Sequence, residues 1–163
     1  MANPGQAVRV LGIDPGLNIT GYGAVDFVGP RPQLVEAGAL RTDPKASLAD
    51  RIAQLHADLG ELLDELKPDT VGLEKLYAHY KHPRTSILMA HARGVLILAC
   101  CQAELPVRSV AATEVKKSLT GKGHASKQQV QRAIASVFGL AEPPSPPDVA
   151  DALAIALCAG RRL

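Results

Sequence analysis

The first third of the chain alternates between apolar runs and turn residues, a pattern typical of short β-strands. Apolar runs cover Val8–Asp14, Gly21–Val28 and Leu34–Thr42, and proline, glycine and asparagine residues separate them. Strands joined by such short connections run antiparallel. The pattern therefore predicts three consecutive antiparallel strands at the start of the fold.

A helical period begins after Ser47. Leucine and isoleucine then recur every three or four residues, as on the buried face of a helix, at Leu48, Ile52, Leu55, Leu59, Leu62 and Leu66. Ser47 and Asp50, three residues apart, are suited to cap the first turn of this helix. Lys67-Pro68-Asp69 ends the helix, and the apolar run Val71–Glu74 predicts a buried parallel strand.

The second half of the chain is mostly helical in its pattern. A helix is expected from His82-Pro83 to about Ala103, followed by a short fifth strand at Val107–Val110. Further helices are expected over residues 112–119, 127–138 and 147–159. This order predicts one α/β domain over residues 1–163, with a mixed five-stranded sheet, three antiparallel strands first, and helices on both faces.

Composition sets limits on what this domain does. A net charge of +2 over 163 residues gives no general affinity for nucleic acid, so any basic surface must be local. Cys100, Cys101 and Cys158 match no metal-binding spacing and are expected to be buried apolar residues in a reducing compartment. The N-terminus lacks a signal-peptide pattern, and the longest apolar stretch, Gly94–Cys101, is too short to cross a bilayer. A cytoplasmic protein without membrane contact is expected.

Four carboxylates lie in three separated segments, at the ends of strands or at the start of a helix. Asp14 ends the first predicted strand and Glu74 ends the fourth. Asp148 and Asp151 lie in the first turn of the last predicted helix and share one of its faces. Desolvated carboxylates repel one another, and a hard divalent cation such as Mg²⁺ relieves that repulsion in an all-oxygen site. The four acids therefore predict a metal site if the fold brings them together.

Each acid also has a simpler explanation. The two acids of the last helix could complement its dipole, and an Asp-Pro-Gly sequence such as that at Asp14 is a common turn. Glu74 could form a buried ion pair with Lys75 or Arg93. These alternatives stay open at the level of the residues alone.

Basic and aromatic residues gather in two places that suit DNA. One surrounds the Gly121-Lys122-Gly123 loop and consists of Lys116, Lys117, Lys122, His124, Lys127 and Arg132. Lysines there would contact phosphates without reading sequence, although a solvated helix face is the alternative. The other place follows Glu74, where Tyr77 could stack on an unpaired base and Arg84 could reach a phosphate.

Five motifs resemble, in the same order, those of the RuvC family of Holliday junction resolvases. They are Gly12-Ile13-Asp14-Pro15-Gly16 with Thr20-Gly21-Tyr22-Gly23, Leu73-Glu74-Lys75, Ala92-Arg93-Gly94, Val115-Lys116-Lys117, and Asp148-Val149-Ala150-Asp151-Ala152-Leu153-Ala154. The resemblance extends from about Val8 to about Ala159 and is most specific in the first and last motifs. It implies an RNase H-like fold of the retroviral integrase superfamily.

The resemblance also implies a function. It implies a homodimer that cuts four-way DNA junctions by symmetric nicks during recombination and repair, leaving 5′-phosphate and 3′-hydroxyl ends. The four acids would hold Mg²⁺ or Mn²⁺, two ions per site, and the RuvA and RuvB branch-migration proteins would be partners. Family lysines matching Lys116 and Lys127 contact the junction backbone. The position of Tyr77 is commonly Phe in the family, and His124 could contact phosphate or a catalytic water.

The helix around Ser86–Cys101 is apolar on most sides after Arg93. One side must face the sheet, and a second apolar side requires another partner. A two-fold copy of the same helix would satisfy it, and the alternative is a cover formed by the C-terminal helix.

Two other functions compete with the nuclease. Ile13-Asp14-Pro15-Gly16 with Thr20-Gly21 also resembles the phosphate loop of the actin and sugar-kinase class, but those proteins bind nucleotide between two domains and this chain is long enough for one. The other alternative is a junction-binding module without catalysis. All four acidic positions are filled, which favours the enzyme.

Overall fold

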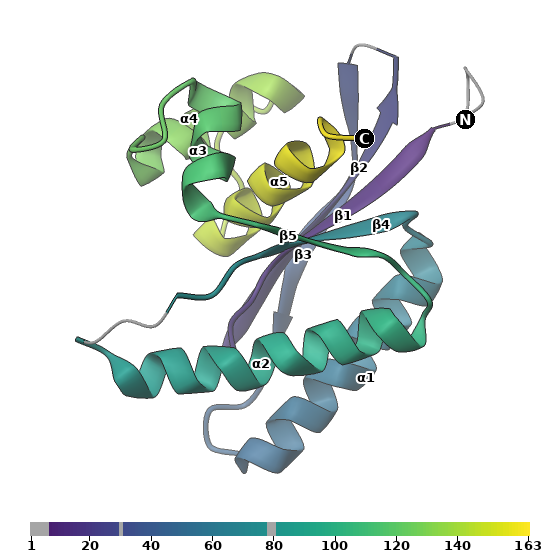
Figure 1. The fold of residues 1–163 in the computed structure, drawn as a ribbon, viewed down its shortest axis with the longest axis vertical. Helices are drawn as coiled ribbons and strands as arrows, with labels where there is room; N and C mark the ends of the chain where they lie inside the picture. The colour runs from purple at the N-terminus through teal and green to yellow at the C-terminus, as the bar shows by residue number, and fades with distance from the viewer. Residues whose placement is uncertain (1–6, 30, 78–80) are drawn as a thin grey trace.

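The computed structural model describes residues 7–29, 31–77 and 81–163 and shows one mixed sheet between two layers of helices (Figure 1). The strands are β1 (Val8–Asp14), β2 (Ile19–Val28), β3 (Arg31–Arg41), β4 (Thr70–Glu74) and β5 (Val107–Val110). The helices are α1 (Leu48–Leu66), α2 (Pro83–Gln102), α3 (Ala112–Thr120), α4 (Lys127–Phe138) and α5 (Pro147–Gly160). The predicted order of elements is confirmed. β3 starts at Arg31 rather than Leu34, because its pairing with β2 continues to Val28 at the hairpin end.

The strands lie in the order β3-β2-β1-β4-β5. β1, β2 and β3 pair antiparallel, while β4 runs parallel to β1 and β5 runs parallel to β4. Ile13 of β1 lies beside Leu73 of β4 in this register. The carboxyl ends of β1 and β4 therefore meet at one edge of the sheet, and the expected mixed five-stranded sheet is confirmed.

Helices cover both faces of the sheet, as predicted. α1 and α2 lie on one face, and α5 lies on the other with α3 and α4 beside it (Figure 1). Leu11 and Ile13 are fully buried among the leucines of α1 and α2. The alternate residues Val10 and Val25 are buried against α5, next to Leu153. The strand alternation thus divides the apolar side chains between two cores.

Glycines allow α5 to lie directly on the sheet. A Cβ atom on Gly12 would lie 2.0 Å from the carbonyl oxygen of Ala152, and one on Gly21 would lie 2.1 Å from that of Asp148. Any larger residue would clash with helix backbone at both places. The glycines of β1 and β2 therefore fix how close α5 comes to the sheet, Gly21 at its first turn and Gly12 farther along the helix.

α2 keeps a large apolar surface exposed. Ile87 is 59% exposed and Leu98 is 50% exposed. The suggestion that the C-terminal helix covers this side is wrong, because α5 packs on the opposite face of the sheet (Figure 1). By length and composition only, α2 could cross a membrane, with a mean hydropathy of 1.3, but 22% of that window is buried within the fold. One such helix is weak evidence for a membrane span.

The cysteines only partly match the expectation. All three are free, and Cys100 and Cys158 are buried as expected. Cys101 is exposed, because one residue along a helix turns the side chain by about 100°. Cys101 therefore points away from the core that buries Cys100.

Candidate active site

Strand geometry directs two of the acids toward α5. Successive side chains of a strand point to opposite faces, so Asp14 faces the same side as Gly12, which lies against α5. By the same rule Glu74 shares the face of Gly72, where a Cβ atom would lie 2.9 Å from the Cβ of Ala159. Because β1 and β4 are parallel neighbours, both carboxylates lie at one edge of the sheet.

The other two acids come from the start of α5. Pro147 is the first residue of the helix, and its fixed φ suits that position. Asp148 lies in the first turn, and Asp151 lies at the start of the second turn rather than in the first as expected; both are half-buried and share one face of the helix. The contact between Gly21 and the backbone of Asp148 holds this turn over the ends of the strands. The fold thus brings all four predicted acids to one place.

The acids repel one another strongly. Burial raises the pKa of Asp14 to about 8, and the charges of Asp151, Glu74 and Asp148 add to the rise. The pKa of Glu74 is also raised, first by burial and then by Asp151. Two buried carboxylates whose pKa values are raised, with two further carboxylates beside them, form a site that favours a bound cation.

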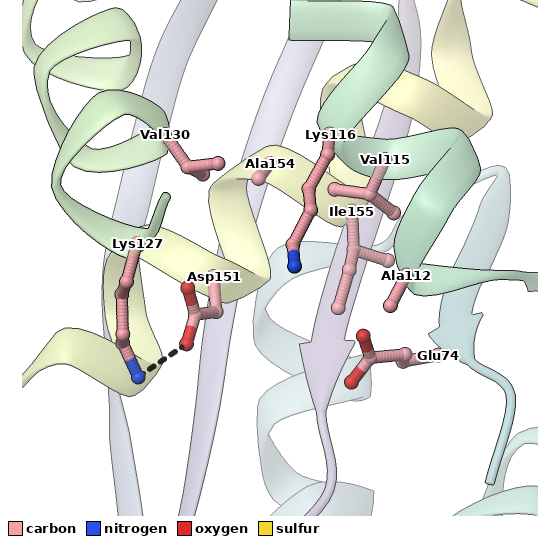
Figure 2. A pocket seen from close by; sticks show the side chains of 9 residues that line it. All are labelled: Glu74, Ala112, Val115, Lys116, Lys127, Val130, Asp151, Ala154 and Ile155. Atoms are coloured by element: carbon pink, nitrogen blue, oxygen red, sulfur yellow. Dashed lines mark ion pairs between the residues drawn. The ribbon is translucent and has the colours of Figure 1, made fainter. Parts of the chain in front are cut away.

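Two lysines partly compensate this charge (Figure 2). The Nζ of Lys127 lies 3.1 Å from Oδ2 of Asp151, and this ion pair was not expected from the sequence. Burial alone would lower the pKa of Lys127, but its hydrogen bond to Asp151 and the nearby charge raise it. Lys116 extends into the same cavity, and its charge opposes the rise in the pKa of Glu74.

The acids and lysines line a cleft with two lobes that share Lys127 and Asp151. The first lobe has a volume of about 220 Å³ and an apolar floor formed by α3, α4 and α5 (Figure 2). The first lobe is lined by Glu74, Ala112, Val115, Lys116, Lys127, Val130, Asp151, Ala154 and Ile155. The second lobe, of about 460 Å³, contains Asp14 and Asp148 together with the loop after β1 and the first turns of α2. A groove of this kind can accept an extended chain such as a DNA strand.

The donor set fits a hard divalent cation. In the described part of the chain, no three acidic, histidine or cysteine side chains form a ready-made metal cage. Mg²⁺ does not require one, because it keeps several waters and takes one or two carboxylates together with phosphate oxygens. The oxygen-only chemistry and the raised pKa of Asp14 therefore agree with such an ion.

The remaining predicted residues lie around the cleft rather than in it. Lys117, Lys122 and His124 are exposed on α3 and on the loop that connects it to α4. Arg84 is exposed in the first turn of α2. Tyr77 follows β4 and is 58% exposed, and the three residues after it lie outside the described part of the chain. None of these five lines either lobe within the described residues.

Arg93 acts on the backbone of Glu74 rather than on its carboxylate. Its Nε donates to the carbonyl oxygen of Glu74 at 3.0 Å, and its Nη2 donates to Oγ of Ser109 at 3.0 Å. Across residues 7–29, 31–77 and 81–163 the Glu74 carboxylate forms no ion pair. The suggested pair of Glu74 with Lys75 or Arg93 is therefore wrong. Arg93 instead fixes the end of β4 against α2 and β5.

Sequence reasoning missed one more group of residues. Arg51 is buried in α1 and donates from Nε to Oγ1 of Thr42 at 3.0 Å and from Nη2 to Oδ1 of Asn18. Asn18 belongs to the loop after β1 that lines the second lobe. The sequence did hold a sign of this group, because Arg51 lies on the same face of α1 as the apolar residues that are predicted to be buried.

A mixed sheet with three antiparallel strands first, and with acids from β1, β4 and the C-terminal helix at one edge, defines an RNase H-like α/β nuclease fold. Comparisons with known proteins agree. The family model for crossover junction endodeoxyribonuclease RuvC matches residues 10–159. The chain belongs to the RuvC family.

Individual relatives cover nearly the whole chain. RuvC of Rhodopirellula baltica is 46% identical over 157 residues, which are 96% of this chain and 88% of that protein. RuvC of Desulforamulus reducens is 40% identical over 149 residues, 91% of each chain. The structure of Thermus thermophilus RuvC in complex with a Holliday junction substrate has a TM-score of 0.86 and 33% identity, covering 93% of this chain and 92% of that one. The yeast mitochondrial Holliday junction resolvase shares the fold, with a TM-score of 0.65 at 16% identity.

Proposed function

We propose that this protein is a structure-specific endonuclease that resolves four-way DNA junctions during recombination and repair by paired, symmetric nicks. The observation that carries the proposal is the meeting of four carboxylates from three segments in a lysine-lined cleft. Similarity to a RuvC solved with a Holliday junction supports the choice of substrate. The products would be nicks with 5′-phosphate and 3′-hydroxyl ends, which a ligase can seal.

Asp14, Glu74, Asp148 and Asp151 would hold Mg²⁺ or Mn²⁺, two ions in each site. Such ions, when bound, supply charge stabilisation and water activation for an in-line displacement at phosphorus. The chain itself brings Asp14 and Glu74, at one edge of the sheet, next to the two acids of α5, and the first lobe has apolar side chains beside Glu74. Lys127 would leave Asp151 and bind a phosphate once a cation takes its place.

The basic residues would form a track for the DNA backbone. Lys116 and Lys127 lie in the cleft and would contact the phosphates nearest the cut. Lys117, Lys122 and His124 would contact phosphates farther along α3 and the loop after it, where all three are exposed. Such contacts hold a duplex in place without reading its sequence.

Tyr77 would stack on a base at the branch point, and Arg84 would bind a phosphate from the start of α2. Tyr77→Ala should therefore slow cleavage of intact junctions more than it weakens their binding, and leave the salt dependence of binding unchanged. Opening a base costs a few kcal/mol, so junctions with unpaired bases beside the cut should partly restore the rate. Rates on intact and pre-opened junctions test this, and the absence of rescue would reject the stacking role.

A homodimer would place two such sites on one junction. The exposed apolar side of α2, which no element of the described chain covers, supports a two-fold contact through this helix. Two sites related by a two-fold axis suit a substrate whose strands are themselves related by symmetry. RuvA and RuvB would be the partners that deliver junctions, and the cytoplasm would be the compartment.

The two competing functions have less support. A nucleotide-binding protein of the actin and sugar-kinase class closes two domains over the nucleotide, and the described residues form one sheet with two helical layers. A binding module without catalysis has no use for four carboxylates that destabilise each other. The nuclease is the function that uses them.

One assay tests the proposal directly. The purified protein is incubated with end-labelled four-way junctions or linear duplexes of the same sequence, in Mg²⁺ or in EDTA. We expect paired nicks at symmetric positions only with junctions and only in Mg²⁺. Binding without cutting in Mg²⁺ would favour the junction-binding module, and equal cutting of linear duplex would reject structure specificity.

A further inference from the structure

The loop that follows Asp14 is held in one conformation by hydrogen bonds from neighbouring strands. The Oγ1 of Thr20 donates to the carbonyl of Gly16 at 2.6 Å and accepts from its N–H at 3.3 Å. The Oγ1 of Thr42 donates to the carbonyl of Leu17 at 2.5 Å, and the backbone N–H of Thr42 donates to the carbonyl of Asn18 at 3.3 Å. A group carried on such a loop loses little conformational freedom when it binds a ligand.

A buried guanidinium lies beneath this loop. Arg51 is 8% exposed and donates to the side chains of Thr42 and Asn18. Within the described ranges of the chain, Arg51 forms no ion pair with a carboxylate. Both acceptors of its side-chain hydrogen bonds are neutral oxygen atoms, so its positive charge is not cancelled there and lies directly behind Asn18, which lines the cleft.

The contact with Arg51 fixes which way the Asn18 amide points. A guanidinium only donates hydrogen bonds, so the carbonyl oxygen of Asn18 must face it. The NH₂ group of the amide is then directed away from Arg51, and in the part of the chain that the structure describes no atom accepts a hydrogen bond from it. Asn18 is exposed and lines the second lobe together with Asp14 and Asp148. The cleft therefore has an oriented, unused hydrogen-bond donor close to the acids.

A neutral donor suits this position better than a cation would. An exposed lysine beside these acids pairs with one of them, as Lys127 does with Asp151. The neutral amide of Asn18 cannot form an ion pair with these acids. The guanidinium of Arg51, bound to the amide oxygen, polarises the amide and makes its NH₂ group a stronger hydrogen-bond donor. The arrangement provides an electropositive contact among carboxylates without neutralising them.

We propose that Asn18 is a DNA-backbone contact, donating from Nδ2 to a phosphate oxygen of the strand in the second lobe, with Arg51 as the residue that orients the amide. The proposal rests on the proposed function, because it requires DNA in the cleft. It assigns a binding role to a loop residue and a positioning role to a buried arginine on a different element.

Two substitutions at Asn18 separate a direct contact from its alternatives. Asn18→Asp keeps an oxygen for Arg51 and adds an ion pair, so the loop and the melting temperature should be kept or improved, but the donor is lost. Asn18→Ala also removes the donor and adds no charge. A residue that only holds the loop would tolerate Asn18→Asp, and a position sensitive only to charge would tolerate Asn18→Ala. A direct contact tolerates neither.

The measurement is the dissociation constant for four-way junctions in EDTA, read over a range of salt concentrations, together with thermal unfolding. We expect Asn18→Ala to weaken binding about tenfold or more, as for the loss of one hydrogen bond to a charged group, with an unchanged salt slope. Asn18→Asp should weaken binding by more than about tenfold, because it also adds repulsion. Gln33→Glu makes the same amide-to-carboxylate change on an exposed residue of β3 and should stay within twofold of the parent.

The outcomes also separate this inference from the proposed function. If the parent protein binds no junction, the function fails, and the inference with it. If the parent binds and either Asn18 variant binds within twofold of it while folded, Asn18 is not a phosphate contact. Should Asn18→Asp prove unstable, Asn18→Ala alone decides the matter by the same criterion.

Discussion

Asp14 carries a charge that the fold makes costly when no cation is bound. Burial raises its pKa to about 8, compared with an ordinary value of 3.8, and the three other acids contribute. A carboxyl group with a raised pKa in the folded state costs stability once it ionises, so the free energy of unfolding should fall as pH rises from about 4 to about 8. A metal ion would restore the loss by binding only the folded state.

Asp14→Asn should therefore abolish cleavage and yet stabilise the metal-free protein. The gain should be about 1 to 3 kcal/mol at pH 8 and close to zero at pH 4, since both proteins are then neutral at this position. Junction binding should persist or tighten, because a negative charge near the phosphates is removed. Chemical denaturation at the two pH values, once in EDTA and once in Mg²⁺ without EDTA, measures this. Equal stability at pH 8 would show that the Asp14 carboxylate is not strained by its neighbours.

The effect of Lys116 can also be predicted for a single residue, because the substitution removes one positive charge from the cleft. Lys116→Ala should weaken junction binding about equally for all DNA sequences and reduce the log–log salt slope by about one unit per lost phosphate contact. Arg31→Ala removes an exposed positive charge at the β2–β3 hairpin, at the opposite end of β2 from Gly21 and Asp14, and serves as the charge-matched control. An unchanged slope for Lys116→Ala would mean that Lys116 acts on Glu74 and not on DNA.

At the scale of elements, the site depends on how α5 lies on the sheet. The first turn of the helix contacts β2 at Gly21, where a Cβ atom would lie 2.1 Å from the carbonyl oxygen of Asp148. That neighbour is backbone, so it cannot move aside as a flexible side chain would. Gly21 thus links the position of the two acids of α5 to the sheet that carries the other two.

Gly21→Ala should shift the start of α5 and remove activity while the domain stays folded. We expect a loss of about 2 to 4 kcal/mol in the free energy of unfolding, as for overpacking against backbone, and a larger proportional loss in cleavage than in junction binding. Gly60→Ala is the matched control, because a Cβ atom there meets nothing within 4 Å and alanine favours the helix. That variant should be as active as the parent and more stable. Normal cleavage by Gly21→Ala would show that the turn tolerates displacement.

The contact between α5 and the sheet separates the part of the site that could be predicted from sequence from the part that could not. Strand alternation and the parallel pairing of β1 with β4 suffice to bring Asp14 and Glu74 together, so that half of the site follows from the apolar pattern. The position of Asp148 depends on contact between backbone atoms across the fold, and only the family resemblance indicated it. The partner of Arg51 could not be inferred either, because a buried arginine can pair with many groups and its choice of Asn18 depends on the loop geometry.

At the scale of the whole molecule, the proposed dimer would bring two sites together through α2. Its exposed apolar side consists of Ile87, Ala90, Gly94, Leu98 and Cys101, spaced three or four residues apart along one stripe of the helix. Gly94 meets no neighbouring atom within 4 Å of a Cβ position, so a second helix could approach closely there. Arg93, next to this stripe, holds the backbone of Glu74. The proposed dimer contact and the active site are therefore connected through a single turn of α2.

Leu98→Glu should convert the proposed dimer into a monomer with little loss of fold stability. Leu98 is half exposed, so a carboxylate there should lower the free energy of unfolding of the single subunit only slightly. In the dimer, two such carboxylates would face each other across the two-fold axis and repel within an apolar contact. Light scattering at micromolar concentration should then give one subunit's mass instead of two. The Leu98→Glu variant should nick one strand of a junction without the paired second nick. Val28→Glu is the control, because it changes an exposed apolar residue of the β2–β3 hairpin; it should remain dimeric and make paired nicks. A monomeric parent protein that still cuts both strands in a coupled way would reject the interface and the role of α2 in pairing the sites.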